Sequence, residues 1–187
     1  PLVAFCPERL AEGNALFEFE NIPVVVGGVN EESGLRASIF WEEVLGIETI
    51  ILEDSRTAEM VKLADNLWID LNIGLANEIA LLSDKLNIDS LEVIKAANTL
   101  PKGQHNVNIL YPGIGVGGYC LTKDALLASW SRQHLFDVKE PLTQSENAIN
   151  INDQMPRMAY EFLKRNIPTL QDLRILLLGI SYRGDVG

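Results

Sequence analysis

The sequence predicts an α/β fold at both ends of the chain, with a mainly α-helical central domain between them. Short apolar runs alternate with one helical pattern over residues 1–56, helical periodicity continues through 57–168, and an apolar run at 175–178 indicates a strand within 169–187. We expect 1–56 to be the C-terminal part of a doubly wound domain and 169–187 to begin another. Both ends therefore look cut, and the chain is expected to be a fragment.

The N-terminal elements follow from alternating short patterns. Residues 2–5, 23–27 and 49–52 are apolar runs of strand length. Residues 31–45 carry apolar side chains at helical spacing. The order strand, loop, strand, helix, strand is typical of an α/β domain.

The central elements are predicted to be helices. The longest runs from Thr57, a suitable N-cap residue, to about Leu86 and would form a spine between domains or across a dimer. Asp89 with Glu92 forms a capping-box pattern that begins a second helix. Two more helices are predicted over 121–132 and 142–166, and a loop over 102–118.

Composition excludes several classes of protein. The 187 residues include 15 Lys and Arg against 26 Asp and Glu, a net charge of −11, and 47% are apolar. Ample apolar content excludes disorder as the main state, and the acidic balance argues against a nucleic-acid partner. Two cysteines indicate a reducing compartment, while the short apolar runs and the start without a basic leader indicate no membrane span and no signal peptide. We expect a cytoplasmic protein without a membrane or nucleic-acid partner.

Residues 113–124 are the most specific candidate site. Gly113, Gly115 and Gly118 have the spacing of a dinucleotide-binding turn, but that turn must follow a buried strand, and none is expected here. We favour a backbone cradle that presents the Cys120 thiol at a helix N-terminus, where aligned N–H groups stabilise anions. The alternative is a tight turn with a buried cysteine. The nearby Lys123 and Asp124 favour the functional interpretation.

Three weaker patterns accompany this loop. Lys62 and Asn66 lie one helical turn apart and could stabilise an oxyanion, although a solvated helix face is the simpler explanation. Glu8 and Glu12 flank a loop after the first expected strand and could include a general base, or could be surface acids. Arg183 follows the last expected strand and suits phosphate contact. No cysteine and histidine cluster has metal spacing, so no metal site is expected.

Together these segments resemble the UDP-glucose/GDP-mannose dehydrogenase family of NAD-dependent nucleotide-sugar 6-dehydrogenases. The resemblance is carried, in order, by CPERLAEG at 6–13, TAEMVKLADN at 57–66, GVGGYCLTKD at 115–124 and LGISYRGDV at 178–186. It implies a partial Rossmann-like domain, a long spine helix and a 6-phosphogluconate-dehydrogenase-like helical dimerisation core.

The resemblance also implies residue roles. Cys120 would be the nucleophile that forms a thiohemiacetal and then a thioester while the sugar C6 alcohol is oxidised to a carboxylate. Lys62 and Asn66 would stabilise the reacting oxygen, Asp124 would hold a water, and Glu8 would serve thioester hydrolysis as a base. Glu12 would orient the site or touch the cofactor. The implied substrate contacts are Arg9, Leu10, Tyr111, Gly115, Gly117, Gly118, Tyr182 and Arg183.

The cofactor implied is NAD, bound mainly by a missing N-terminal domain, and the partners implied are a UDP- or GDP-linked sugar and a second copy of the chain. We expect the fragment alone to bind NAD poorly and to be inactive. Tyr119 stands where many members carry Ser or His, which leaves the sugar open; Arg9 hints at N-acetylated sugars. Two alternatives remain: a non-catalytic dimerisation module, and a 6-phosphogluconate or hydroxyacid-type dehydrogenase, which would need no cysteine.

Overall fold

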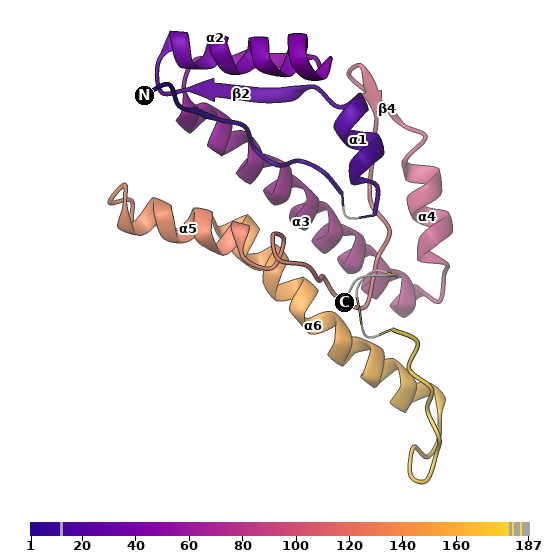
Figure 1. Ribbon diagram of the computed structural model, residues 1–187. Helices are drawn as coiled ribbons and strands as arrows, with labels where there is room; N and C mark the ends of the chain where they lie inside the picture. Colours follow the sequence, from indigo (N-terminus) through magenta and orange to yellow (C-terminus); the bar gives the residue numbers. More distant parts are fainter. Residues whose placement is uncertain (12, 180, 182–183, 185–187) are drawn as a thin grey trace. The chain divides into compact units, whose positions relative to one another are not determined.

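The computed structural model describes residues 1–11, 13–179, 181 and 184 (Figure 1). The chain divides into two compact units, Pro1–Asp65 and Asn66–Gly187. The long helix α3, Ser55–Leu86, contributes residues to both units. Each unit is described by itself below.

The first unit contains a three-stranded sheet in the order β1-β2-β3. The central strand β2, Val24–Gly28, pairs antiparallel with β1, Ala4–Phe5, and parallel with β3, Thr49–Leu52. Val25 and Val26 of β2 are buried, as expected for a central strand whose two faces are both covered. The predicted α/β order of this part of the chain is confirmed.

Helix α2, Glu31–Ile39, connects the parallel strands and lies beside β2 (Figure 1). Asn30 caps it by accepting from the Ser33 backbone N–H at 2.9 Å. The predicted helix over 31–45 continues as a π-helical segment, Phe40–Val44. A seven-residue helix α1, Ala15–Asn21, occupies a segment for which the sequence predicted no element.

The start of α3 differs from the prediction. The helix begins at Ser55, and its cap is Asp54, whose Oδ1 accepts from both the backbone N–H and the hydroxyl of Thr57 at 2.8 Å. Thr57 is therefore a donor inside the first turn, and its expected role as N-cap is wrong. The two Thr57 hydrogen bonds, with the Arg56 guanidinium, lower the pKa of Asp54 to about 2.

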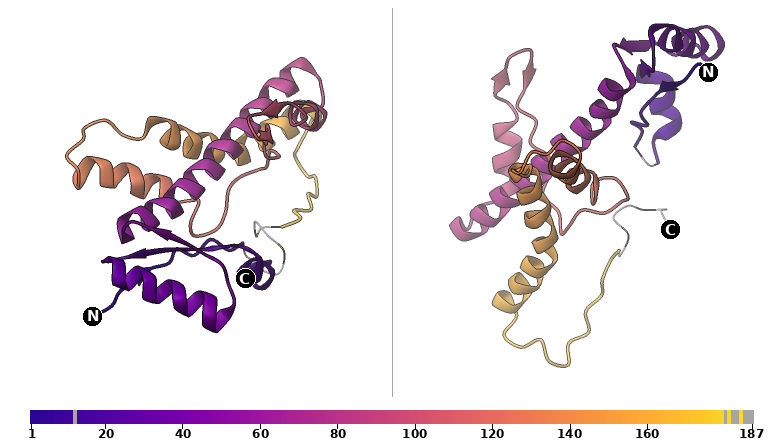
Figure 2. Two further views of the ribbon diagram at one scale, coloured as in Figure 1. Left: turned by 90° about the horizontal axis from the view of Figure 1, so that it is seen from above. Right: turned by 90° about the vertical axis from the view of Figure 1, so that its left-hand side faces the viewer.

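The second unit is built from helices (Figures 1 and 2). After α3, Asp89 caps α4, Ser90–Ala97, as predicted, by accepting from Leu91 N–H at 2.8 Å. The segment predicted as a loop contains a small hairpin of β4, Pro101–Lys102, and β5, His105–Asn106. Helices α5, Asp124–His134, and α6, Thr143–Asn166, follow and pack against each other.

The predicted strand at 175–178 is wrong. These residues form no strand, and Leu176, Leu177 and Leu178 are 82%, 77% and 90% exposed. A strand needs a neighbour to take its hydrogen bonds, and within the described residues none pairs with this run. In the described part of the C-terminal end, the expected strand is therefore not formed. Among the described residues, no helix combines the length and apolarity needed to cross a membrane.

Candidate active site

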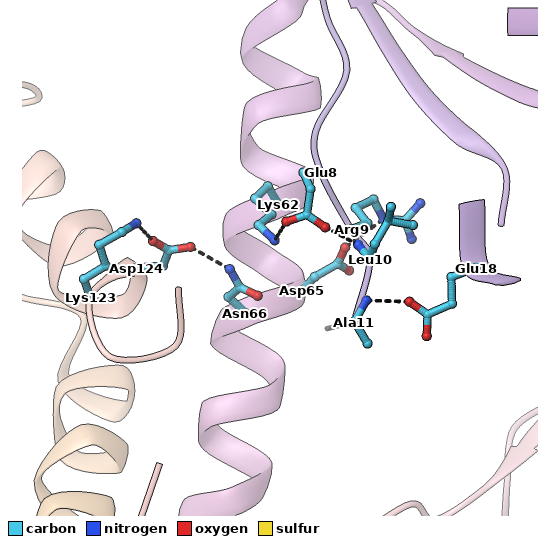
Figure 3. A network of polar contacts seen from close by, with 10 residues as sticks. All are labelled: Glu8, Arg9, Leu10, Ala11, Glu18, Lys62, Asp65, Asn66, Lys123 and Asp124. Carbon is cyan, nitrogen blue, oxygen red and sulfur yellow. Dashed lines mark hydrogen bonds and ion pairs between the residues drawn. The ribbon is translucent and has the colours of Figure 1, made fainter. Parts of the chain in front are cut away.

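In the first unit, the loop after β1 meets the start of α3 through two ion pairs (Figure 3). Lys62 Nζ lies 3.4 Å from Glu8 Oε2, and Arg9 Nε donates to Asp65 Oδ2 at 3.0 Å. The Lys62 side chain is largely buried, whereas the Glu8 side chain is 60% exposed. Glu8 and Lys62 were predicted independently, and the structure brings them together. The Asp65 partner was missed, although it lies between the predicted Lys62 and Asn66.

Cys6 and the following residues also line a pocket of about 200 Å³ within the first unit. Arg9 and Leu10, both expected substrate contacts, form part of its wall together with Phe19, Pro23 and Trp41. The pocket is mostly apolar and smaller than the 300–1,000 Å³ typical of sites for drug-sized ligands. It can therefore hold one ring or an acyl group of a larger ligand.

In the second unit, Cys120 lies in a turn that precedes α5. Its carbonyl accepts from the backbone N–H groups of Lys123 and Asp124, at 3.1 and 2.9 Å. The predicted helix start at Leu121 is therefore too early by about one turn, because α5 begins at Asp124. The thiol is half-buried and belongs to no disulfide. A free cysteine with partial access to solvent is suited to react with a ligand.

Asp124 connects the cysteine turn to α3 (Figure 3). The residue is 4% exposed, and its Oδ2 accepts from Asn66 Nδ2 at 2.6 Å. Its other oxygen is paired with Lys123, and this hydrogen bond raises the pKa of the Lys123 ammonium. Both carboxylate oxygens are thus engaged with a donor, so the side chain is held in one orientation. Two predicted site residues that lie 58 positions apart in sequence therefore make direct contact.

The glycine loop before Cys120 is irregular, and no strand leads into it. This confirms that the glycine spacing is not a dinucleotide-binding turn. Gly118 has a φ of +91°, which an L side chain rarely adopts, so glycine is required there. Among the other expected substrate contacts, Tyr111 and Gly115 are exposed and Gly117 is half-buried.

Two asparagines that the sequence analysis did not single out hold the chain leading to this loop. Asn72 of α3 donates to Asn108 O at 2.7 Å and accepts from Leu110 N–H at 2.8 Å. Asn98, which follows α4, makes the same pair of contacts with the backbone of Ile109, at 2.9 and 2.8 Å. Each amide forms hydrogen bonds with backbone N–H and C=O groups of residues 108–110, as a neighbouring strand would do in a sheet. For Asn72, its position within the long helix was the only signal in the sequence, and Asn98 had none beyond its place at the end of α4.

Three of the expected site residues have no described position. Glu12, Tyr182 and Arg183 lie outside the described residues. Within the described part of the chain, the glycine loop does not fit a dinucleotide and no other residue was expected to contact one, so NAD is assigned no contact here. The same residues contain no group of three or more metal-ligating side chains that could hold an ion.

Comparisons with known proteins give consistent matches. The family model for the UDP-glucose/GDP-mannose dehydrogenase family, central domain, matches residues 56–154. The UDP-N-acetyl-D-mannosamine dehydrogenase of Methanocaldococcus jannaschii is 37% identical over 185 residues, which cover 98% of this chain and 40% of the relative.

Solved structures agree with these matches. The UDP-D-ManNAc dehydrogenase from Pyrococcus horikoshii matches with a TM-score of 0.73 and 36% identity, covering 87% of this chain and 37% of that one. The NDP-N-acetyl-D-galactosaminuronic acid dehydrogenase from Methanosarcina mazei matches with a TM-score of 0.75 and 30% identity, covering 88% and 36%. The chain thus spans about 40% of the length of the curated relatives it matches.

Proposed function

Because this chain belongs to the UDP-glucose/GDP-mannose dehydrogenase family, we propose that it supplies the catalytic side chains of a nucleotide-sugar 6-dehydrogenase. The reaction is oxidation of a sugar C6 alcohol to a carboxylate, in a complete protein that contains these residues. The observation that carries the proposal is the hydrogen bond from Asn66 to the buried Asp124, one turn after Cys120. It joins the amide expected to stabilise an oxyanion to the segment that bears the expected nucleophile.

The Cys120 thiolate adds to the C6 aldehyde produced by the first oxidation, and a thiohemiacetal forms. Loss of hydride from its C6 gives a thioester, which water cleaves to the carboxylate and the free thiol. When bound by the complete protein, NAD would supply the oxidising equivalents for the two oxidations. Covalent capture keeps the aldehyde in place for the second oxidation, which raises its effective concentration.

The remaining side chains of the proposed site stabilise negative charge on the substrate or take part in proton transfer. Lys62 and Asn66 lie four residues apart on α3 and so project from one side of that helix. They stabilise the oxyanion that develops at C6. Asp124, oriented by Asn66 and Lys123, holds a water. Glu8 serves as the base for thioester hydrolysis, and Arg9, Leu10 and the glycine loop contact the substrate.

The substrate we propose is a UDP-linked N-acetylhexosamine. The relatives at 33–37% identity are named UDP-N-acetyl-D-mannosamine dehydrogenases, and they align with 98% of this chain. Arg9 supports this choice through the resemblance described above. Its guanidinium is fixed by Asp65 and by the carbonyl of Pro23 at 3.4 Å, which leaves it pre-oriented at the wall of the small pocket.

We further propose that the helical part forms a homodimer. Trp68, Leu75 and Leu82 of α3 are 51%, 46% and 61% exposed and recur every seven residues, which places them along one stripe. A row of large apolar side chains of this kind is a common protein interface. Equilibrium sedimentation tests it: Leu75→Glu should yield monomers, and a dimer that persists in this variant contradicts the assignment.

The experiment that tests the function replaces Cys120 by serine in the complete protein, with Cys6→Ser as the matched control. Cys120→Ser should reduce formation of the sugar acid by on the order of 10³-fold, because a hydroxyl is a far weaker nucleophile than a thiolate. Cys6→Ser should keep kcat nearly unchanged, because the Cys6 thiol takes no part in the covalent step, and any effect at the wall of the small pocket should appear in KM. Full activity in Cys120→Ser would exclude the covalent mechanism and favour a hydroxyacid-type dehydrogenase. Absence of any nucleotide-sugar oxidation in the unmodified protein would favour a dimerisation module.

A further inference from the structure

A buried chain of hydrogen bonds runs from the glycine loop to a carboxylate on α3, entirely within the second unit. The backbone N–H of Gly113 donates to Asn77 Oδ1 at 3.0 Å, and Asn77 Nδ2 donates to Asn152 Oδ1 at 2.9 Å. Asn152 Nδ2, from α6, then donates to Asp70 Oδ1 at 3.2 Å. Asn77, Asn152 and Asp70 are all at least 98% buried. The contacts among these three side chains therefore lie away from bulk water, where they are strongest, and the Gly113 contact at the end of the chain is partly buried.

The direction of this chain is fixed by its two ends. A backbone N–H can only donate, and an ionised carboxylate can only accept. Each amide must therefore present its oxygen toward Gly113 and its nitrogen toward Asp70. A set of hydrogen bonds that all point one way polarises its members, so the charge on Asp70 strengthens the contact made at Gly113.

An ionised Asp70 carboxylate in this buried position lowers the stability of the folded state. It is 1% exposed, and its Oδ2 has no hydrogen-bond partner among the described residues. The charged groups that act on it are Asp153 on α6 and Asp124 on α5, and both are negative. Burial, with a smaller contribution from these two carboxylates, raises the pKa of Asp70 to about 6. A neutral side chain would fill the same space without this penalty, which points to a role other than stability.

We propose that Asp70 is a positioning residue, which acts through Asn152 and Asn77 to fix the backbone of Gly113 and so the glycine loop that leads to Cys120. Its consequence for substrate binding rests on the proposed function, whereas its effect on Gly113 does not. The ionised carboxylate is the stronger acceptor, so the loop is held more firmly as pH rises through the titration of Asp70.

Hydrogen exchange at the Gly113 amide tests the proposal directly, measured in the complete protein. Asn152→Leu removes the amide contacts with Asn77 and Asp70 while keeping the same number of side-chain heavy atoms. Asn150→Leu makes the same change at an exposed position of α6. The protection factor of Gly113 should fall about tenfold or more in Asn152→Leu and stay unchanged in Asn150→Leu, and KM for a UDP-N-acetylhexosamine should rise while kcat changes little. Unchanged protection in Asn152→Leu would overturn the proposal.

Asp70→Asn provides the second variant, because asparagine keeps the accepting oxygen and loses the charge. Corrected for intrinsic exchange, Gly113 protection should rise between about pH 5 and pH 7 in the wild type and stay flat in Asp70→Asn. The same pH dependence in both proteins would contradict the proposal. If the protein oxidises no nucleotide sugar, the proposed function fails, and the exchange data still decide whether Asp70 positions Gly113.

Discussion

Two buried carboxylates in the helical unit have opposite surroundings. Asp124, beside the cysteine turn, accepts from Asn66 and is paired with Lys123, so both of its oxygens are engaged. Asp70, between α3 and α6, accepts from Asn152 with one oxygen and has no partner for the other among the described residues. For Asp70, burial with a donor at only one oxygen opposes ionisation and raises its pKa. The two regions therefore differ in the donors that they offer to a buried carboxylate.

The largest expected effect in this comparison is that of Asp124→Ala. The substitution leaves the buried Asn66 amide without its acceptor, which costs about 1–3 kcal/mol in the free energy of unfolding. It also removes the carboxylate proposed to hold a catalytic water, so kcat should fall by about 10²-fold or more. Chemical denaturation and steady-state kinetics measure the two effects.

A matched control removes Lys123, which is the other partner of the Asp124 carboxylate. Lys123→Met breaks the ion pair with Asp124 at the solvent-exposed side, since the Lys123 side chain is 61% exposed. It should cost less than about 1 kcal/mol, as exposed ion pairs do, and retain most activity. If Lys123→Met were as damaging as Asp124→Ala, the orientation of the carboxylate would depend on Lys123 at least as much as on Asn66.

Asp70→Asn should change the free energy of unfolding in the opposite direction to Asp124→Ala, and it should not remove a catalytic group. Because the pKa of Asp70 is raised from 3.8 to about 6, the folded state binds more protons than the unfolded state between these values. Stability contributed by this group is thus highest below about pH 4 and is lost as pH rises to about 6. Asparagine carries no such penalty, so the variant should be more stable than the wild type at pH 8 by about 1–3 kcal/mol.

The pH series distinguishes this explanation from a general packing effect. The gain in Asp70→Asn should vanish near pH 4, where the wild-type carboxyl is neutral in both states. Glu78→Gln, at an exposed position on the same helix, should change stability little at any pH. A gain that is the same at pH 4 and pH 8 would mean that packing, and not ionisation, distinguishes the two side chains.

The sequence predicted the elements better than it predicted their contacts. The capping aspartate of α4 and the strands predicted at 23–27 and 49–52 have local signals, and both predictions are confirmed. The apolar run at 175–178 has the composition of a strand but forms none, because composition does not reveal whether a partner is available. The cap of α3 is Asp54 in place of Thr57, since both residues suit a helix start and only the geometry separates them.

The candidate site shows the same limit. Residue types and motif order nominated Glu8, Lys62, Asn66 and Asp124, and the structure brings Glu8 to Lys62 and Asn66 to Asp124. The residues that hold the glycine loop from α3 and α6, Asn77 and Asn152, could not be predicted. Their contacts join positions 36 and 75 residues apart, and nothing in a helical pattern distinguishes a buried asparagine that accepts from a loop from one that faces solvent.

The most direct test of the central claim is to trap the acyl group on Cys120. The complete protein, as the Glu8→Gln variant, is incubated with NAD and a UDP-N-acetylhexosamine, quenched in acid and digested for mass spectrometry. Slowed hydrolysis should allow a thioester to accumulate, so the peptide containing Cys120 should carry the mass of the oxidised nucleotide sugar, while the peptide containing Cys6 stays unmodified. Continued formation of the sugar acid with no adduct at Cys120 under any quench time would contradict the account.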